Sequence, residues 1–417
     1  MKIEVLGGAR EVGGSCISVQ TDDCKIALDY GTRLDEEAPK LPRNFDAVII
    51  SHAHLDHSGS LLNLSDNNPV IVGSKITRDI TNELLHDMIK IQNEEGNFQF
   101  YDEDAAKISE AWLTRNSIAL PGMAIQLQSA GHVAGAKITC IEAENKKIVY
   151  TGDFCLHDTE ILEGCNPETL PREPDVLISE CTYGGKIRLP RSQLINQFYK
   201  QVSKTMERKG NILIPTFAFH RTQEMARRID QAMENGTLPR YNVYTISNLA
   251  HRINRYFQEN KRLFTQEVQR QEHPFNYRHV KHLNRTRQIR EPAIVIATSG
   301  FGHAGASLRL LTQWAEDPHN SVILTSGFLP ADSPLKQAKE NRTLKDNGET
   351  INVQAEIEQI ELSGHADQNE LIQFINNLKP KRTLLVHGEL DQAQALQEKI
   401  SEITDAYIPE KGETINL

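Results

Sequence analysis

The clearest chemical pattern in the chain is one short run, Ser51-His-Ala-His-Leu-Asp-His57. Histidines at positions i and i+2 of an extended chain point the same way, so His52 and His54 can bind one ion. Asp56 and His57 follow at a turn and can face a second ion nearby. Burying these donors without a cation would cost several kcal/mol in unmet polar groups. The run therefore predicts a metal site.

Two ions need more ligands than this run supplies, and suitable donors recur where other short apolar runs end. Three histidines are expected to form one nitrogen-rich pocket: His52, His54 and His132. A carboxylate and two histidines are expected to form its neighbour: Asp56, His57 and His387. Asp153, in Tyr-Thr-Gly-Asp-Phe, is short enough to bridge the two pockets. Nitrogen and carboxylate donors without thiolate favour zinc, with manganese as the other candidate, so we expect two Zn2+ per chain.

Short apolar runs must position these donors. Five β-rich runs end in a polar residue of the kind that binds metals or moves protons: 25–29, 46–51, 147–153, 175–180 and 382–387. Runs bounded in this way are typical of buried strands, and chemistry tends to occur where strands give way to loops. Asp29 ends the first run. We interpret it as a hydrogen-bond acceptor that fixes a ligand histidine.

A second set of apolar runs indicates a separate α/β unit. Its strands are expected at four places: 211–215, 241–246, 292–297 and 321–325. They alternate with helix-like stretches at 193–209 and 222–235, which favours a parallel, doubly wound sheet. Acidic residues or histidines at strand ends occur both before and after this unit. We therefore predict a domain inserted at 183–350 into a first domain made of residues 1–182 and 351–417.

The composition excludes several classes of protein. The 417 residues carry 46 Lys and Arg against 56 Asp and Glu, a net charge of −10, so the surface as a whole is not basic. No run approaches the roughly 18 apolar residues that a membrane helix needs, and the N-terminus lacks the apolar stretch of a secretion signal. The six cysteines include no CxxC pair, which is typical of reduced cytosolic thiols. We expect a cytoplasmic protein with no membrane segment.

One stretch departs from this acidic balance. Residues 251–290 contain ten Lys or Arg and three Glu, a local charge of +7. Five aromatic residues are interleaved with these charges: Tyr256, Phe257, Phe264, Phe275 and Tyr277. Such a pattern is expected where phosphates are neutralised and bases stack. The alternative is a solvated helix face whose aromatic residues turn toward the core.

The motifs also resemble those of a known family. The run at 51–57, the glycine-flanked His132 and Thr151-Gly-Asp153 are similar to the motifs of metallo-β-lactamase fold hydrolases. Three more motifs resemble the β-CASP branch of nucleases: Ser179-Glu-Cys-Thr-Tyr-Gly184, Ser363-Gly-His-Ala-Asp367 and Val386-His-Gly-Glu389. Within that branch the chain most resembles the endonuclease subunit of the cleavage and polyadenylation specificity factor and its archaeal and bacterial homologues. The resemblance implies an αββα metallo-β-lactamase sandwich with an inserted β-CASP α/β domain.

The resemblance further implies a function and several roles. It predicts a zinc-dependent ribonuclease that hydrolyses single-stranded RNA. The protein would act as a homodimer or as part of an RNA-processing complex. Glu180 would hold the imidazole of His365, which would act as general acid toward the leaving oxygen, and Asp56 would be a catalytic residue as well as a ligand. Three residues of the insert would contact substrate: Arg221, Ser299 and Gly300. Endonuclease and 5′-to-3′ exonuclease action both stay open.

Two alternatives compete with the ribonuclease. The first is a non-nucleolytic hydrolase of the same fold, which would not need a large insert or the Glu180 and His365 pair. The second is a catalytically silent scaffold subunit of an RNA-processing complex. Silent paralogues lose metal ligands, whereas every expected ligand position in this chain is filled. The zinc content of the purified protein separates the scaffold from the enzyme.

Overall fold

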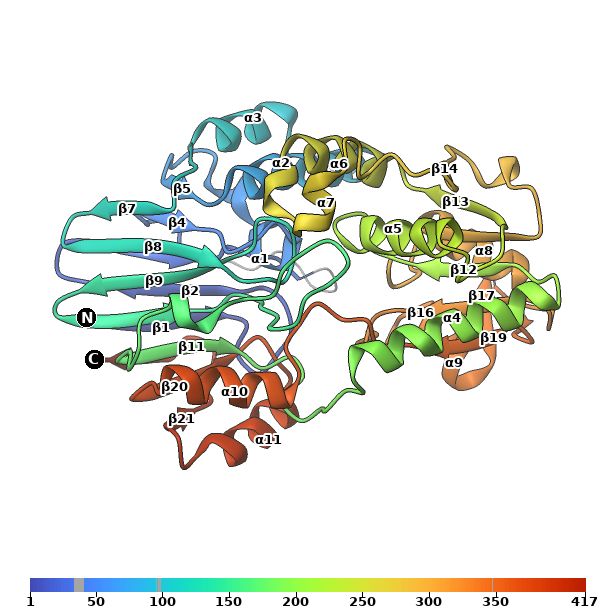
Figure 1. Ribbon diagram of the computed structural model, residues 1–417. Helices are drawn as coiled ribbons and strands as arrows, with labels where there is room; N and C mark the ends of the chain where they lie inside the picture. The colour runs from blue at the N-terminus through green and yellow to red at the C-terminus, as the bar shows by residue number, and fades with distance from the viewer. Residues whose placement is uncertain (34–40, 95, 97–98, 347) are drawn as a thin grey trace. The chain divides into compact units, whose positions relative to one another are not determined.

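The computed structural model describes residues 1–33, 41–94, 96, 99–346 and 348–417 (Figure 1). The chain divides into two compact units. The first combines Met1–Ile187 with Gly364–Leu417, and the second is the continuous segment Arg188–Ser363. Each unit has its own sheets and its own apolar core.

Two seven-stranded sheets form the centre of the first unit. One has the order β22-β1-β2-β3-β4-β5-β6, and the other has the order β21-β20-β11-β10-β9-β8-β7. The first sheet contains β1 (Lys2–Gly7), β2 (Cys16–Gln20), β3 (Lys25–Leu28), β4 (Ala47–Ile49), β5 (Val70–Val72), β6 (Trp112–Leu113) and β22 (Thr414–Asn416). The second contains β7 (Ser117–Leu120), β8 (Met123–Ser129), β9 (Lys137–Ala143), β10 (Lys146–Tyr150), β11 (Val176–Glu180), β20 (Arg382–Val386) and β21 (Asp405–Tyr407).

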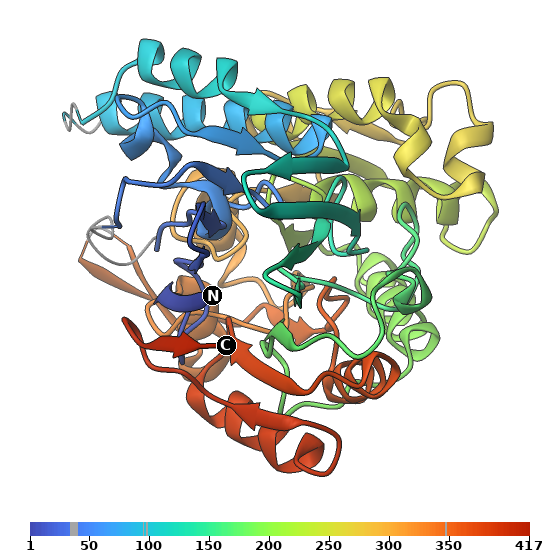
Figure 2. The same cartoon turned by 90° about the vertical axis from the view of Figure 1, so that its left-hand side faces the viewer.

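The two sheets pack face to face. Alternate residues of β1 and β2, such as Ile3 and Val19, join one buried cluster with Ile125 of β8 and Ile148 of β10. The alternation follows from the two-residue period of a strand, which sends every second side chain to the same face. Each fully buried aliphatic side chain contributes about 1.5–3 kcal/mol. Figure 2 shows the two chain ends side by side, where β1 pairs with β22.

Helices complete the layers of the first unit. They are α1 (Leu55–Ser58), α2 (Lys75–Glu94), α3 (Asp102–Glu110), α10 (Gln368–Leu378) and α11 (Leu390–Ile400), with the 3₁₀ turns η1 (Leu61–Leu64) and η2 (Pro167–Thr169). Leu85 of α2 and Ile108 of α3 pack on Val48 and Ile71, on the other face of the first sheet. Helices α10 and α11 lie beside the second sheet (Figure 1). The expected αββα sandwich is confirmed.

The second unit is built on a six-stranded sheet in the order β14-β13-β15-β12-β16-β19, with every neighbouring pair parallel. Its strands are β12 (Ile212–Pro215), β13 (Asn242–Ile246), β14 (Val280–His282), β15 (Ala293–Ala297), β16 (Ser321–Leu324) and β19 (Glu356–Gln359). Ile212 and Ile214 face one apolar cluster and Leu213 faces another, so both sides of the sheet are covered. The expected parallel sheet is confirmed.

The helices of the second unit connect these strands. They are α4 (Arg191–Glu207), α5 (Arg221–Glu234), α6 (Asn248–Glu259), α7 (Gln266–Arg270), α8 (Gly305–Trp314) and α9 (Pro334–Asn341). Two 3₁₀ turns, η3 (Lys261–Leu263) and η4 (Thr286–Gln288), and a hairpin of β17 (Thr343–Asp346) with β18 (Glu349–Asn352) complete the unit. Because β19 pairs with β16, this unit extends past the expected boundary at 350. It also begins after the expected start at 183.

Four of the five aromatic residues of the basic stretch do not support base stacking. Phe257, Phe264 and Phe275 are each at most 5% exposed and pack on one another with ring centroids 4.9–5.2 Å apart. The Tyr277 hydroxyl donates to the Gln223 carbonyl. These side chains belong to the core, so the alternative interpretation is correct for them, while most of the basic side chains stay exposed.

All six cysteines are buried free thiols. Burial raises the pKa of Cys24 to about 11 and that of Cys140 to about 12, which keeps both protonated at neutral pH. Within the described ranges, no helix combines the length and the apolar character that crossing a bilayer requires.

Candidate metal centre

The histidine run occupies the end of a central strand. Strand β4 stops at Ile49, the chain passes through His52 in a loop, and α1 begins at Leu55 with His54 at its N-cap. The backbone N–H of His57 donates to the His54 carbonyl over 2.9 Å, which turns the chain back on itself. As a result, both halves of the run face the same space. His52 and His57 are fully buried.

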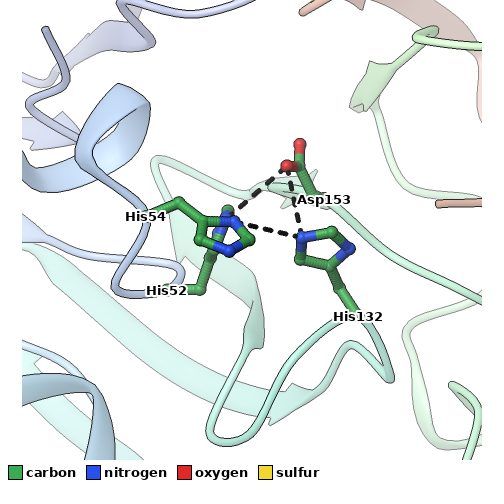
Figure 3. Close-up of side chains that lie close together, drawn as sticks. All are labelled: His52, His54, His132 and Asp153. Atoms are coloured by element: carbon green, nitrogen blue, oxygen red, sulfur yellow. Dashed lines mark hydrogen bonds and ion pairs between the residues drawn. The ribbon is translucent and has the colours of Figure 1, made fainter. Parts of the chain in front are cut away.

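The first pocket gathers the donors expected for one ion (Figure 3). His52 Nε2 lies 3.0 Å from His54 Nδ1, which lies 3.4 Å from His132 Nε2. Asp153 Oδ2 lies 3.5 Å from His52 Nε2 and 3.7 Å from His132 Nε2. Four side chains from three separate segments of the chain thus converge on one point, as predicted.

The second pocket lies directly beside the first. His57 Nε2 is 3.3 Å from His387 Nε2, which is 3.4 Å from Asp56 Oδ2. The same Asp153 Oδ2 that faces the first pocket lies 3.3 Å from His57 Nε2. Asp153 therefore stands between the two donor sets, in the position of the expected bridging ligand.

The donor set fits divalent metal ions. Burial lowers the pKa of His52 and His132 well below the usual range and that of His54 to about 4, so all three imidazoles are neutral with a lone pair to offer. Asp153 Oδ1 lies 3.2 Å from His387 Nδ1, yet it is buried and accepts no hydrogen bond. A buried carboxylate oxygen without a hydrogen bond is costly, and a cation would satisfy it.

The second pocket adds a strongly negative field. Burial alone would lower the pKa of His57, but the carboxylates of Asp153, Asp29 and Asp56 raise it well above its ordinary value. Burial alone would likewise raise the pKa of Asp56, but His57 and His387 lower it. Because these carboxylates favour a positive charge in the second pocket, the pocket suits a divalent cation. The residues present therefore fit zinc in both pockets.

Asp29 fixes the orientation of His57. Its Oδ2 accepts hydrogen bonds from His57 Nδ1 (2.6 Å), from the Tyr150 hydroxyl (2.6 Å) and from the Ser51 hydroxyl (2.7 Å), while Oδ1 accepts the Ser51 N–H at 2.6 Å. A proton held on Nδ1 leaves the Nε2 lone pair available for a metal, the arrangement expected for a carboxylate behind a metal histidine. Sequence reasoning found Asp29 but missed Tyr150 and Ser51.

Other outer contacts orient the remaining histidines. His132 Nδ1 lies 2.9 Å from the Gly364 carbonyl, which aims the opposite ring nitrogen at the first pocket. His387 Nδ1 lies 3.2 Å from the Thr182 hydroxyl, and its backbone has a φ of 49°, in the left-handed region. No spacing rule in the sequence identifies such partners, because they lie on different segments.

Glu180 and His365 form a pair beside the pockets. His365 Nδ1 lies 2.9 Å from Glu180 Oε2 and 3.9 Å from Asp153 Oδ2. The other oxygen of Glu180 accepts the Phe154 N–H at 2.8 Å, so the carboxylate is fixed at the end of β11. Glu180 is buried, while His365 is 19% exposed on its side chain. This pair matches the one expected from the sequence.

The three expected substrate residues belong to the second unit. Arg221 starts α5 and pairs with Glu224 of the same helix, which Arg191 of α4 also contacts. Ser299 and Gly300 follow β15. A Cβ on Gly300 would lie 3.1 Å from the Phe217 ring, so the glycine there permits close packing. These contacts give Arg221 and Gly300 structural roles, and contact with substrate stays a prediction for all three residues.

Three family models match the chain in order. A metallo-beta-lactamase superfamily model covers residues 9–192, a Beta-Casp domain model covers 222–328, and a model described as a Zn-dependent metallo-hydrolase RNA specificity domain covers 350–409. The last range includes His365 and His387.

Curated relatives cover nearly the whole chain. It is 31% identical over 440 residues to the probable RNase MJ4 of Methanocaldococcus jannaschii, covering 100% of both chains. It is 30% identical to Integrator complex subunit 11 of Danio rerio, covering 100% of this chain and 74% of the relative. It is 31% identical to cleavage and polyadenylation specificity factor 73 of Drosophila melanogaster, covering 95% and 61%.

A crystal structure from Enterococcus faecalis V583, titled as a protein of unknown function, has the same fold. It superposes with a TM-score of 0.61 at 17% identity over 100% of this chain and 99% of that one. The two-sheet sandwich with its His and Asp cluster is that of a metal-dependent hydrolase. The chain belongs to the β-CASP family of RNA-specific, zinc-dependent metallo-hydrolases in the metallo-β-lactamase superfamily. The family resemblance and the enzyme class expected from the sequence are confirmed.

Proposed function

We propose that this protein is a ribonuclease that hydrolyses the phosphodiester bonds of single-stranded RNA with two zinc ions. One observation carries the proposal. A single carboxylate oxygen, Asp153 Oδ2, lies 3.3–3.7 Å from histidine nitrogens of both pockets, and the His365 ring lies 3.9 Å away. Two adjacent cation sites with a proton donor beside them suit in-line phosphoryl displacement.

Each pocket has its own proposed ligands. His52, His54 and His132 would hold one ion, and the second pocket would use Asp56, His57 and His387, with Asp153 shared. Bound zinc would supply a Lewis acid and lower the pKa of its water toward neutrality. Asp29 keeps a proton on Nδ1 of His57, so that its other nitrogen can bind the metal. Asp56 acts in the reaction through its place in the second pocket.

His365 is the proposed general acid. Glu180 accepts a hydrogen bond from its Nδ1, which orients the ring and leaves Nε2 to carry the transferred proton. The ring can then donate a proton to the departing ribose 3′-oxygen. The products would carry a 5′-phosphate and a 3′-hydroxyl. Endonuclease action is proposed as the main mode, with 5′-to-3′ exonuclease action as a second mode.

RNA as substrate rests on three observations. The family model that covers residues 350–409 is described as an RNA specificity domain. A relative that matches the whole chain is named as a probable RNase. Three aromatic side chains also follow three adjacent strands of the second unit: Phe217, Phe301 and Phe328. Phe217 is 39% exposed, and its ring centroid lies 4.9 Å from that of Phe301. An exposed ring can stack on a base.

Arg221, Ser299 and Gly300 are proposed to contact the RNA backbone from the same unit. Relatives named as subunits of Integrator and of the cleavage and polyadenylation factor support an RNA-processing complex as a partner, with a homodimer as the alternative. The cytoplasm stays a prediction made from the sequence.

Cleavage of labelled RNA tests the proposal. The purified protein is incubated with unstructured RNA labelled at the 5′ or the 3′ end, and the products are sized over time. His54→Ala and Asp153→Ala should abolish cleavage, because each removes a ligand that no neighbour replaces. Arg240→Ala, at an exposed position of the second unit, is the control and should cleave at the wild-type rate. Wild-type rates in the Asp153 variant would refute the two-metal scheme. Internal fragments indicate an endonuclease, and mononucleotides released from the 5′ end indicate an exonuclease.

A further inference from the structure

A second group of metal-type donors lies in the first unit, outside the two pockets. It consists of Cys155, His157 and Glu370, whose donor atoms lie within 4.8 Å of one another. Cys155 Sγ lies 3.3 Å from His157 Nδ1 and 3.4 Å from its Nε2, and Nδ1 lies 2.9 Å from Glu370 Oε1. Cys155 is fully buried, and the side chains of His157 and Glu370 are 26% and 18% exposed.

The backbone holds these donors in place before any ion binds. Glu370 belongs to the capping box of α10, in which its Oε2 accepts the Asp367 N–H at 3.1 Å while Oε1 faces His157. The N–H of Cys155 donates to the Ala130 carbonyl at 3.0 Å, and its own carbonyl accepts the Cys165 N–H at 2.7 Å. Preorganised ligands lose little conformational entropy when they bind.

The spacing also suits tetrahedral coordination. Zinc bonds of about 2.0–2.3 Å at tetrahedral angles put neighbouring donors about 3.3–3.8 Å apart. The Cys155 to His157 separation of 3.3 Å is in this range, but Sγ is almost equally far from Nε2, at 3.4 Å, so the His157 ring must turn for Nδ1 and Sγ to bind one ion. The His157 to Glu370 separation of 2.9 Å must also open. The side chains of His157 and Glu370 are partly exposed, so solvent would supply water as the fourth ligand.

We propose that Cys155, His157 and Glu370 form a third metal site that binds one Zn2+ through sulfur, nitrogen and oxygen. The thiolate sets this site apart from the two pockets, whose donors are all nitrogen and oxygen, and it favours a soft or borderline ion such as zinc. The inference stands apart from the proposed ribonuclease activity, because it depends only on these three donors.

The site would hold a key loop against a helix. Asp153 precedes it by two residues, and between them the Phe154 N–H donates to Glu180 while the Phe154 carbonyl accepts the Ala366 N–H at 2.7 Å. An ion bound to the loop at Cys155 and to α10 at Glu370 would therefore fix the segment that carries Asp153. The three donors act as positioning residues, because none of them belongs to the donor sets of the two pockets.

Cobalt substitution tests this site by a signal that the two pockets cannot give. Co2+ bound by a thiolate has a charge-transfer absorption in the near ultraviolet, whereas Co2+ bound by imidazole and carboxylate alone has none. The wild-type holoprotein, stripped and reloaded with Co2+, should show this band. Cys155→Ser should abolish it and lower the metal content by one equivalent per chain. Cys165→Ser, a buried cysteine outside the donor group, is the matched control and should keep both.

A second variant tests the site even if Cys155→Ser does not fold. Glu370→Gln keeps the size of a partly exposed side chain and should weaken the third ion at least tenfold in a chelator competition, while the metal of the two pockets stays bound. A wild-type protein without the charge-transfer band would overturn the proposal. A band that persists in Cys155→Ser would also overturn it, because the thiolate would then come from another cysteine.

Discussion

Replacing Asp29 by Asn should selectively weaken the second metal pocket. The substitution keeps the shape of a fully buried side chain and removes its charge. Oδ2 of Asp29 accepts three hydrogen bonds of 2.6–2.7 Å, from His57, Tyr150 and Ser51. An amide nitrogen at that position can only donate. The two hydroxyls can rotate and accept, but His57 Nδ1 can accept only if its proton moves to Nε2.

That tautomer would put a proton on the ligand atom of His57, which lies 3.3 Å from both Asp153 and His387. Loss of such a carboxylate behind a metal histidine typically costs 10–100-fold in metal affinity, or about 1.4–2.7 kcal/mol. We expect a loss in this range for one of the two ions. The first pocket should change less, because Asp29 contacts none of its histidines among the hydrogen bonds of the described residues.

Competition with a chromophoric zinc chelator measures both affinities. Tyr150→Phe is the matched control, since it removes one hydrogen bond to Asp29 without changing its charge or the His57 tautomer. It should cost about 1 kcal/mol of folding stability and little affinity. Equal zinc affinities in Asp29→Asn and the wild type would show that His57 keeps its tautomer without Asp29, and the reasoning would fail.

Three further predictions test other parts of the molecule. His365→Ala should keep its zinc but lose about 10²–10⁴ in turnover, with partial rescue by substrates whose leaving groups have a low pKa; unchanged turnover would exclude it as the general acid. Arg221 and Arg191 lower the pKa of Glu224 despite its burial, so its contribution to stability is present above the unfolded pKa near 4.5 and is lost as pH falls. Urea unfolding between pH 3 and 7 should show this slope in the wild type and less of it in Glu224→Gln, which should be about 3–5 kcal/mol less stable at pH 7. Replacing three exposed arginines of the basic stretch, Arg285, Arg287 and Arg290, should flatten the salt dependence of RNA binding by about 0.7 per lost phosphate contact, whereas an unchanged slope would remove them from the RNA path.

The metal centre was predictable because its donors are unusual at their positions. Four donors within six residues, and single histidines or acids at the ends of buried strands, have few other uses. The partners behind these donors were not predictable, since Tyr150 and Ser51 are common residue types in strands and loops. The sequence analysis missed a further donor group for another reason, namely that of Cys155, His157 and Glu370. Glu370 is separated from His157 by 213 positions, so no local spacing joins them.

Two differences between the sequence analysis and the structure have physical causes. In α6, Ile253 and Phe257 are buried at helical spacing, and such an amphipathic helix shows the same interleaving of charges and aromatic rings as a base-stacking surface. The end of the insert was placed before β19 because that strand, Glu-Ile-Glu-Gln, is an edge strand without an apolar run. Its membership in the sheet depends on pairing with β16, which the sequence does not reveal.

The discontinuity of the first unit has a consequence for biosynthesis. Strand β11 ends the first segment and pairs in parallel with β20, which the ribosome makes only after the whole of Arg188–Ser363. Until β20 emerges, β11 is an open edge that can pair with other chains. His365 and His387 arrive with the same late segment. A nascent chain stalled before residue 364 would thus be both aggregation-prone and without His387, a proposed metal ligand, so the proposed second pocket is complete only at the end of synthesis.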